Sequence, residues 1–326
     1  MNTEKSPLPR RKALAYLTAL ACAAALPLRA QQAAPVRMVL PFSAGGPTDA
    51  VARNITSLMS SHLGVPFVVE NKVGANGAIA SAFVANSAPT GETLLYHSSA
   101  FTLEAALRKN LPYDPLNDFS YIGLTTSTPL VLLVHKDFPA HTPEEFIAAM
   151  KANPGKFNYG AVIRSIVHVA PEQLFHSLGV KALAVPYKGT APALVDLMGG
   201  QVDFAFDAVN SALPHIRGGR VRAIAVTSPE KLAVLPDVPT FSETVLPGFE
   251  AGTWGGIMAP AGLARDQLMR LHQALTSALT DPAFRTQVVS QGLNIVGGTP
   301  EEMSTFIRND IARWKQVAAS AQLPIE

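Results

Sequence analysis

The loop Pro41-Phe42-Ser43-Ala44-Gly45-Gly46-Pro47-Thr48-Asp49 holds a serine, two glycines and a threonine between a short apolar run and a helical pattern. Such a loop could bind an anion, because glycines let the backbone approach closely and a helix N-terminus presents unpaired N–H groups. Thr48 could add its hydroxyl to that site, or it could cap the helix. The alternative is a tight turn followed by a capped helix, without a ligand.

Ser43 also raises a hydrolase hypothesis, because Pro41-Phe42-Ser43-Ala44-Gly45 resembles a nucleophile elbow. An elbow needs a strained turn around its serine, and a proline with fixed φ stands here in place of the first glycine. The pattern therefore favours an ordinary loop serine over a catalytic one. No glycine pattern in the chain matches a dinucleotide fingerprint or a P-loop, so we expect no nucleotide cofactor.

The histidines and acidic residues show no pattern typical of a metal site or of an acid–base pair. His168 and His176 share a predicted helix but lie eight residues apart, and no pair among the eight histidines has zinc-protease spacing. Asp203 and Asp207 bracket one short apolar strand and do not face each other. Asp207 is expected either to cap a helix or to reach a ligand. We therefore predict no metal, no cofactor and no enzyme activity.

Short apolar runs alternate with helical patterns, which predicts an α/β fold with a parallel sheet and crossover helices. In the first half, helices at 51–62 and 77–86 separate three predicted strands, namely Val36–Leu40, Phe67–Val69 and Thr93–Tyr96. The second half repeats this order with a helix at Thr190–Met198 among the strands Leu183–Pro186, Phe204–Phe206 and Ala223–Thr227. Thr142 and Thr299 each precede Pro-Glu-Glu, which predicts two helices that begin with a capping box.

Residues 1–30 are typical of a secretory signal peptide, because Arg10-Arg11-Lys12 precede an apolar run that ends shortly before Ala30. Lipid attachment at Cys22, the only cysteine, is the less favoured interpretation of this segment. The rest of the chain has 21 basic and 23 acidic side chains, so its net charge is −2. This balance gives no argument for binding nucleic acid.

About 296 residues remain beyond this segment, which at roughly 100 to 200 residues per domain suggests two domains. The apolar runs Leu130–His135 and Thr253–Ala259 are flanked or interrupted by Pro or Gly, and we expect them to connect two lobes. The first lobe would then be discontinuous, with residues 31–136 and 252–326, and the second would hold residues 137–251. The predicted architecture is two doubly wound lobes joined by two crossing strands.

Blocks of sequence that cover nearly the whole chain after residue 38 resemble one family. They include Val39-Leu40-Pro41-Phe42, Ala44-Gly45-Gly46 with Asp49 and Arg53, Val69-Glu70-Asn71-Lys72, Leu111-Pro112-Tyr113-Asp114-Pro115, Val185-Pro186-Tyr187-Lys188-Gly189, Gly199-Gly200-Gln201-Val202-Asp203 and Leu235-Pro236-Asp237-Val238-Pro239-Thr240. With them the chain resembles the tripartite tricarboxylate transporter receptors, also called the Bug or TctC-like family of periplasmic solute-binding proteins.

The resemblance implies a type II periplasmic-binding-protein fold that closes by a hinge on a di- or tricarboxylate or an acidic amino acid. It places one carboxylate at the first helix, and it places further ligand contacts on both lobes. The residues matched in this way are Ser43, Ala44, Gly45 and Thr48, then Ser98 and Ser99, and from the second lobe Tyr187, Lys188 and Asp207. It also implies a monomeric periplasmic receptor whose partners are membrane transporter subunits. A ligand-sensing module that signals to a membrane sensor kinase is the alternative.

The segment 161–173 departs from the family pattern of serines and glycines that leads to a helix start. In one interpretation, Arg164 binds a carboxylate in a bidentate way, with Ser165 beside it, and the loop changes selectivity. In the other, Arg164 points to solvent, or the segment reflects two compensating reading-frame errors. The β-branched residues in this loop favour the second interpretation, because they rarely adopt the positive φ that glycine allows.

Overall fold

The computed structural model describes residues 34–323 and residue 325. The predicted signal peptide and Cys22 lie outside these residues. From Pro35 onward the chain forms one compact unit. Within the described ranges, no helix has both the length and the apolar character needed to cross a membrane.

Strands and helices alternate along the chain, as the sequence pattern predicts. The strands are β1 (Val36–Leu40), β2 (Phe67–Asn71), β3 (Thr93–Ser98), β4 (Phe119–Val134), β5 (Asn158–Ala161), β6 (Leu183–Pro186), β7 (Phe204–Ala208), β8 (Arg222–Val226), β9 (Gly252–Pro260) and β10 (Asn294–Ile295). The helices are α2 (Pro47–Leu63), α3 (Ala78–Ala85), α4 (Ala100–Leu107), α5 (Pro143–Ala152), α6 (Ile166–Leu178), α7 (Thr190–Met198), α8 (Val209–Arg217), α9 (Phe241–Thr244), α10 (Arg265–Thr280), α11 (Pro282–Ser290) and α12 (Pro300–Ser320), with a short 3₁₀ turn, η1 (Ala75–Gly77).

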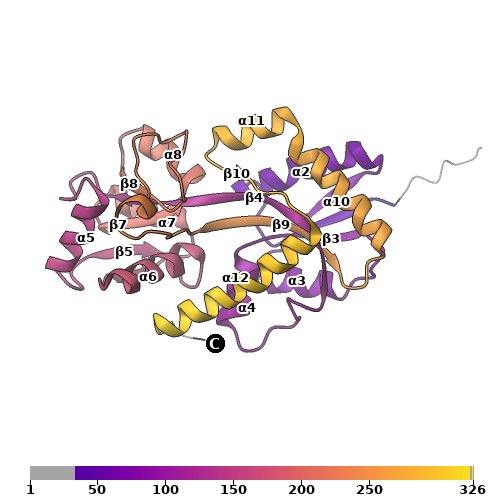
Figure 1. Cartoon of the computed structure of the whole chain (residues 1–326), viewed down its shortest axis with the longest axis horizontal. Helices are drawn as coiled ribbons and strands as arrows, with labels where there is room; N and C mark the ends of the chain where they lie inside the picture. The colour runs from indigo at the N-terminus through magenta and orange to yellow at the C-terminus, as the bar shows by residue number, and fades with distance from the viewer. Residues whose placement is uncertain (1–33, 324, 326) are drawn as a thin grey trace, which may run out of the picture. The chain divides into compact units, whose positions relative to one another are not determined.

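We call the first lobe the part of the sheet with the strand order β2-β1-β3-β9-β4, which has helices on both faces (Figure 1). β1 is parallel to β2 and β3, so the predicted βαβαβ unit forms. Alternate residues of β1 enter different cores, because successive side chains of a strand point to opposite faces. Met38 packs in a cluster with α2 and α10, and Val39 packs in a cluster with α3 and α12.

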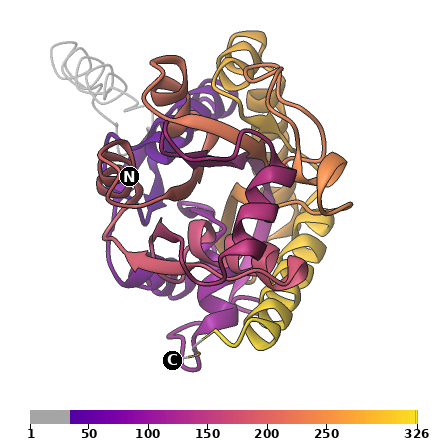
Figure 2. The ribbon, with the colours of Figure 1, turned by 90° about the vertical axis from the view of Figure 1, so that its left-hand side faces the viewer.

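The second lobe continues from the same sheet, because β4 is long enough to take part in both lobes. Its first part pairs antiparallel with β9, and Leu130–Val134 lie between β7 and β8. Beyond β7 the strands β5 and β6 pair in parallel. Figure 2 turns the molecule so that this lobe faces the viewer. The predicted strand Leu130–His135 is thus too short, since β4 begins at Phe119, before the polar residues Thr125 to Thr128 that interrupt its apolar pattern.

Pro129 of β4 pairs with Gly252 of β9 at one end of the pairing between the two strands that connect the lobes. A Cβ atom on Gly252 would lie 2.6 Å from the carbonyl oxygen of Thr128, so only glycine fits there without a backbone shift. Thr227, just after β8, joins the crossing because its N–H donates to the carbonyl of Leu130 at 2.9 Å. The boundaries predicted for the lobes, at residues 136 and 251, stay predictions.

The two predicted capping boxes have different outcomes. Thr299 accepts from the N–H of Glu302 while the Glu302 carboxylate accepts from the N–H of Thr299, so this box forms. Thr142 accepts from the N–H of Glu145, but the Glu145 carboxylate accepts from the N–H of His141 instead. The prediction for Thr142 was therefore right about the cap and wrong about the reciprocal bond from Glu145.

Candidate ligand-binding site

A cleft of about 370 Å³ lies where the two lobes meet, within the usual volume range of small-ligand sites. Its walls come from α2, β3, α4, β4 and β9 of the first lobe and from the β5–α6 connection, α7, β7 and α8 of the second. Most of the wall is apolar. The polar side chains that line it are Thr48, Tyr96, Ser98, Ser99, Thr126, Thr128, Ser165, Thr190, Asp207, Asn210, Ser211, Thr253 and Trp254.

In the described part of the chain, the N-terminal turns of five helices line this cleft. Each helix start is represented on the wall, by Thr48 for α2, Ser99 for α4, Ser165 for α6, Thr190 for α7 and Asn210 for α8. Helix N-termini carry partial positive charge and unpaired N–H groups. No lysine, arginine or histidine is among the described residues that line the cleft. The positive potential therefore comes from the backbone, which suits a small anion.

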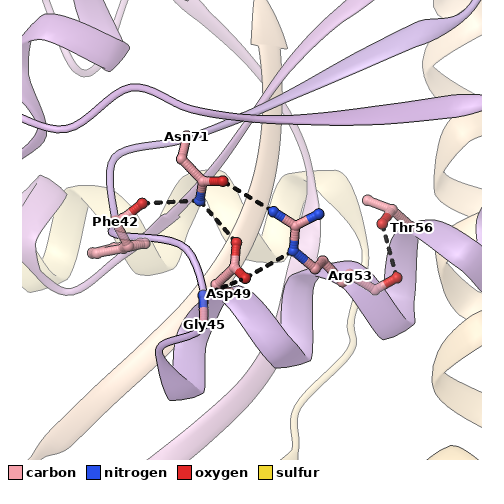
Figure 3. Close-up of polar contacts among 6 residues, drawn as sticks. All are labelled: Phe42, Gly45, Asp49, Arg53, Thr56 and Asn71. Carbon is pink, nitrogen blue, oxygen red and sulfur yellow. Dashed lines mark hydrogen bonds and ion pairs between the residues drawn. The ribbon is translucent and has the colours of Figure 1, made fainter.

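The loop before α2 is held by the buried carboxylate of Asp49 (Figure 3). Asp49 accepts hydrogen bonds from the N–H of Gly45 at 3.0 Å and from Nε of Arg53 at 2.8 Å. Asn71 at the end of β2 donates Nδ2 to Asp49 at 2.8 Å and to the carbonyl of Phe42 at 2.9 Å. The hydrogen bond from Arg53, with smaller contributions from Asn71 and Gly45, lowers the pKa of Asp49 to about 2. The network fixes the start of α2 against the sheet.

A fully buried histidine, His97, packs against the same loop. His97 lies between the rings of Phe42 and Phe101, at centroid distances of 5.8 and 5.4 Å. Its Nδ1 accepts from the N–H of Ser98 at 2.8 Å, so the neutral ring carries its proton on Nε2. Burial lowers the pKa of His97 to about 3. Gly77, with φ of +98°, lies against Nε2 and leaves no room for a Cβ atom. His97 thus acts as packing that holds Phe42 and Ser98 in place.

Hydroxyl groups cover the first-lobe side of the cleft. Ser99 donates its Oγ to Oγ1 of Thr253 at 3.0 Å, which joins the start of α4 to β9. Ser98 ends β3 beside it, and Thr126 and Thr128 project from β4 into the same cleft. A carboxylate can accept hydrogen bonds from such hydroxyls as well as from helix N–H groups.

On the second-lobe side, Asp207 is 2% exposed and reaches the starts of two helices. It accepts hydrogen bonds from the N–H of Ala208 at 2.9 Å and from the Ser211 hydroxyl. Burial raises the pKa of Asp207, whereas hydrogen bonds from Ser211, Ala208 and the Thr190 side chain oppose that shift. Asp207 contacts the Ser211 hydroxyl in the first turn of α8 but makes no side-chain cap there. It lines the cleft, and its contact with a ligand stays a prediction.

The divergent loop forms a tight turn before α6. Arg164 adopts φ of +66°, so the positive φ falls on an unbranched residue and not on one of its β-branched neighbours. Its N–H donates to Nδ1 of His168 at 3.3 Å. Ser165 donates its hydroxyl to the carbonyl of Val162 at 2.7 Å. Val162 and Ile166 line the cleft, whereas Arg164 does not.

The structure brings together five of the residues predicted from the sequence. Thr48, Ser98, Ser99, Ser165 and Asp207 all line the cleft. The other predicted residues do not, namely Ser43, Ala44, Gly45, Arg164, Tyr187 and Lys188.

Specific contacts explain why several of these residues lie outside the cleft. Ser43 and Ala44 are exposed, and the N–H of Gly45 is used by Asp49. Tyr187 donates its hydroxyl to Asp196 at 2.5 Å, and this bond raises the pKa of Tyr187 to about 12. Lys188 is exposed.

Sequence reasoning missed several residues of the cleft. Thr190, Asn210 and Ser211 lie in the first turns of helices, and helix starts after strands were the one signal that could have found them. Thr126, Thr128 and Thr253 lie inside crossing strands, where an alternating pattern does not indicate which face meets a ligand.

Comparison with known proteins places this fold and this cleft in one family. A family model described as the tripartite tricarboxylate transporter family receptor matches residues 51–323. The solved structure of the periplasmic binding protein BugD is 36% identical and has a TM-score of 0.77, and the match covers 89% of this chain and 98% of that one.

Two further solved structures contain carboxylates. An R. palustris protein with adipate is 31% identical with a TM-score of 0.80, over 88% of this chain and 97% of that one. MatC from Rhodopseudomonas palustris with bound malate is 35% identical with a TM-score of 0.75, over 87% and 98% of the two chains. These similarities confirm the predicted α/β periplasmic-binding-protein fold. The chain therefore belongs to the tripartite tricarboxylate transporter receptor family, the Bug or TctC-like solute-binding proteins.

Proposed function

We propose that this protein is a periplasmic receptor that captures a small organic carboxylate in the cleft and delivers it to a membrane transporter of the tripartite tricarboxylate type. The observation that carries this proposal is the meeting of five helix N-termini at a cleft whose described lining includes no cationic side chain. Such a site attracts a carboxylate through fixed backbone dipoles. The adipate and malate held by two relatives support the same chemistry.

Ligand capture would proceed by closure of the lobes about β4 and β9. A ligand shifts the balance toward a closed state only if it contacts both lobes, and the cleft walls come from both. The closure would bend the two strands near Pro129 and Gly252, where β4 and β9 pair between the two lobes. Small-angle scattering with and without ligand should show a decrease in the radius of gyration on binding.

The proposal is for a receptor and not for an enzyme. Ser43, the residue of the hydrolase hypothesis, is exposed and lies outside the cleft. Delivery to a transporter, the alternative of signalling to a sensor kinase, and a monomeric state all stay predictions. Affinity capture with detergent-solubilised membranes would show which membrane protein binds the ligand-loaded form.

The direct test of ligand class is calorimetry on protein that has been unfolded and refolded to remove any bound ligand. The titrants are malate, succinate, adipate, citrate, glutamate, hexanoate and benzoate, with adipamide and hexanamide as uncharged controls. Carboxylates should bind and the amides should not, because the helix N-termini favour negative charge. Equal binding of hexanoate and hexanamide, or binding of none of the carboxylates, would contradict the proposal.

A further inference from the structure

The second-lobe wall of the cleft differs in chemistry from the first-lobe wall. On the second lobe, the buried carboxyl of Asp207 lies beside the starts of α7 and α8. It accepts from the N–H of Ala208 and from the hydroxyls of Ser211 and Thr190. Whether its carboxyl is ionised or protonated, these donors are used by the protein's own side chain. An anionic group of a ligand would meet the carboxyl of Asp207 there.

The remaining second-lobe helix start, that of α6, is covered by aliphatic side chains. Val162, Ile166 and Val167 line the cleft at this point, and Leu130 of β4 extends the same apolar surface. The Ser165 hydroxyl donates to the carbonyl of Val162, so its proton is not available to a ligand. The part of the cleft beside α6 is therefore suited to hydrocarbon.

Among the described residues that line the cleft, the first-lobe side has hydroxyl groups and no carboxyl group. The first turn of α4 contains no acidic residue, and the N–H of Ala100 donates to Oγ of Ser98 at 3.4 Å. The acidic residue in the first turn of α2, Asp49, is paired with Arg53 and held by Asn71. Thr48, Ser98 and the β4 threonines add hydroxyl groups on the same side.

From this asymmetry we propose that the ligand is a monocarboxylate with an apolar body. Its single carboxylate binds the first-lobe hydroxyls and the starts of α2 and α4, and its hydrocarbon or aromatic part packs on Val162, Ile166 and Val167. The inference rests on the proposed function and narrows its ligand class. A dicarboxylate of equal length would place its second charge beside Asp207 or against aliphatic side chains, where the described lining offers no cation.

Calorimetry with pairs of equal carbon skeleton tests the proposal. Hexanoate should bind at least tenfold more tightly than adipate, and 4-methylbenzoate more tightly than terephthalate. Within the monocarboxylates, affinity should rise roughly fourfold per added methylene from butyrate to hexanoate, as expected for burial of hydrocarbon. Adipate is an informative competitor because a relative at 31% identity holds it.

A matched pair of substitutions locates the apolar contact. Val162→Thr keeps the shape of the side chain but adds a hydroxyl in the cleft. Val195→Thr makes the same change on α7, where the side chain is 61% exposed and does not line the cleft. Val162→Thr should weaken hexanoate binding severalfold and reduce the preference over adipate, whereas Val195→Thr should leave both affinities unchanged. Circular dichroism would check that both variants are folded.

The outcomes separate this inference from the proposed function. If adipate binds as tightly as hexanoate or more tightly, the monocarboxylate class is wrong while the carboxylate receptor stands. If hexanoate is preferred but Val162→Thr has no effect on it, the assignment of the apolar contact to the β5–α6 loop is overturned. If no carboxylate binds, the proposed function itself fails.

Discussion

Asn71, the last residue of β2, donates its Nδ2 to Oδ1 of Asp49 in the first turn of α2 at 2.8 Å. The same nitrogen donates to the carbonyl of Phe42, and Oδ1 of Asn71 accepts from Arg53 at 2.9 Å. One amide side chain thus links the end of β2, the loop after β1 and the helix that begins at the cleft. The position of the α2 N-terminus depends on these contacts.

Asp49→Asn should destabilise the protein and weaken ligand binding, because an amide cannot pair with Arg53 as the carboxylate does. The pKa of Asp49 falls to about 2 from 3.8, which corresponds to at most about 2 kcal/mol, reduced by solvent at the half-exposed Arg53. Urea unfolding measures the stability loss, with Ser57→Asn, a change at an exposed position on the same helix, as the control. A variant with unchanged stability and affinity would show that the network does not hold the loop.

The pH dependence of this contribution has a definite sign. A carboxylate with a lowered folded pKa contributes stability that is complete above the unfolded pKa of 3.8 and is lost as the pH falls through about 2. The wild-type protein should therefore lose this part of its free energy of unfolding between about pH 4 and pH 2. Asp49→Asn should show no such loss. Denaturant midpoints across that pH interval provide the measurement.

His97 should make the protein sensitive to mild acid. Its folded pKa of about 3 lies below the ordinary 6.5, so between these values the unfolded chain binds a proton that the folded protein excludes. Stability should fall by roughly 1.4 kcal/mol per pH unit as the pH drops below about 6.5, from this group alone. His97→Leu should remove this dependence of the free energy of unfolding on pH, whatever the substitution does to stability at pH 7. His62→Gln, at an exposed position, should retain the dependence. An identical slope in wild type and His97→Leu would refute the prediction.

Gly252→Ala should destabilise the crossing of the two lobes. The added Cβ would lie 2.6 Å from the Thr128 carbonyl oxygen, and backbone atoms at a strand pair cannot move aside cheaply. We expect a loss of about 1–3 kcal/mol in urea unfolding. The matched control is Gly199→Ala, where φ is −84° and the nearest atom would be 3.5 Å from the new Cβ. An equal loss of stability in both variants would show that the crossing is no more sensitive to an added Cβ atom than the end of α7.

Tyr187→Phe should leave ligand affinity within about twofold of wild type, because the Tyr187 hydroxyl donates to Asp196 and does not line the cleft. Ser99→Ala should weaken binding about five- to tenfold, because the Ser99 hydroxyl holds Oγ1 of Thr253 in the cleft wall and one such hydrogen bond contributes roughly 1 kcal/mol. Titration calorimetry with the best carboxylate compares the two. The reverse order of effects would restore the role that the family resemblance gave to Tyr187.

Local sequence patterns predicted an element of the fold well where its buried residues and its flanking turn residues indicate the same bounds. Val36–Leu40, Leu183–Pro186 and Thr190–Met198 have the predicted bounds. The long strand β4 was missed in part, because polar residues that face the cleft interrupt its apolar pattern. The antiparallel insertion of β9 between β3 and β4 could not be predicted from periodicity, since pairing partners distant in sequence leave no local pattern.

The site was predicted less completely than the fold. Thr48 lies in the loop after β1, where the general rule for open α/β sheets expects a ligand. Ser98 ends β3 and was matched only through the family. Gly45 and Tyr187 were matched through the family, but their hydrogen-bonding groups are directed to Asp49 and Asp196. The direction of a hydrogen bond depends on tertiary neighbours, which a motif does not specify.

The placement of β9 has a consequence for synthesis of the chain. Met258 of β9 pairs with both Leu95 and Tyr121, so β3 and β4 lack the strand between them until this residue leaves the ribosome. The strands of the second lobe are complete much earlier, at Val226. The second-lobe strands are therefore present before the first-lobe sheet can be completed, although Trp314 and Val317 of α12 join the second-lobe core last. The open edges of β3 and β4 are then the surfaces that chaperones must shield from aggregation until translation ends.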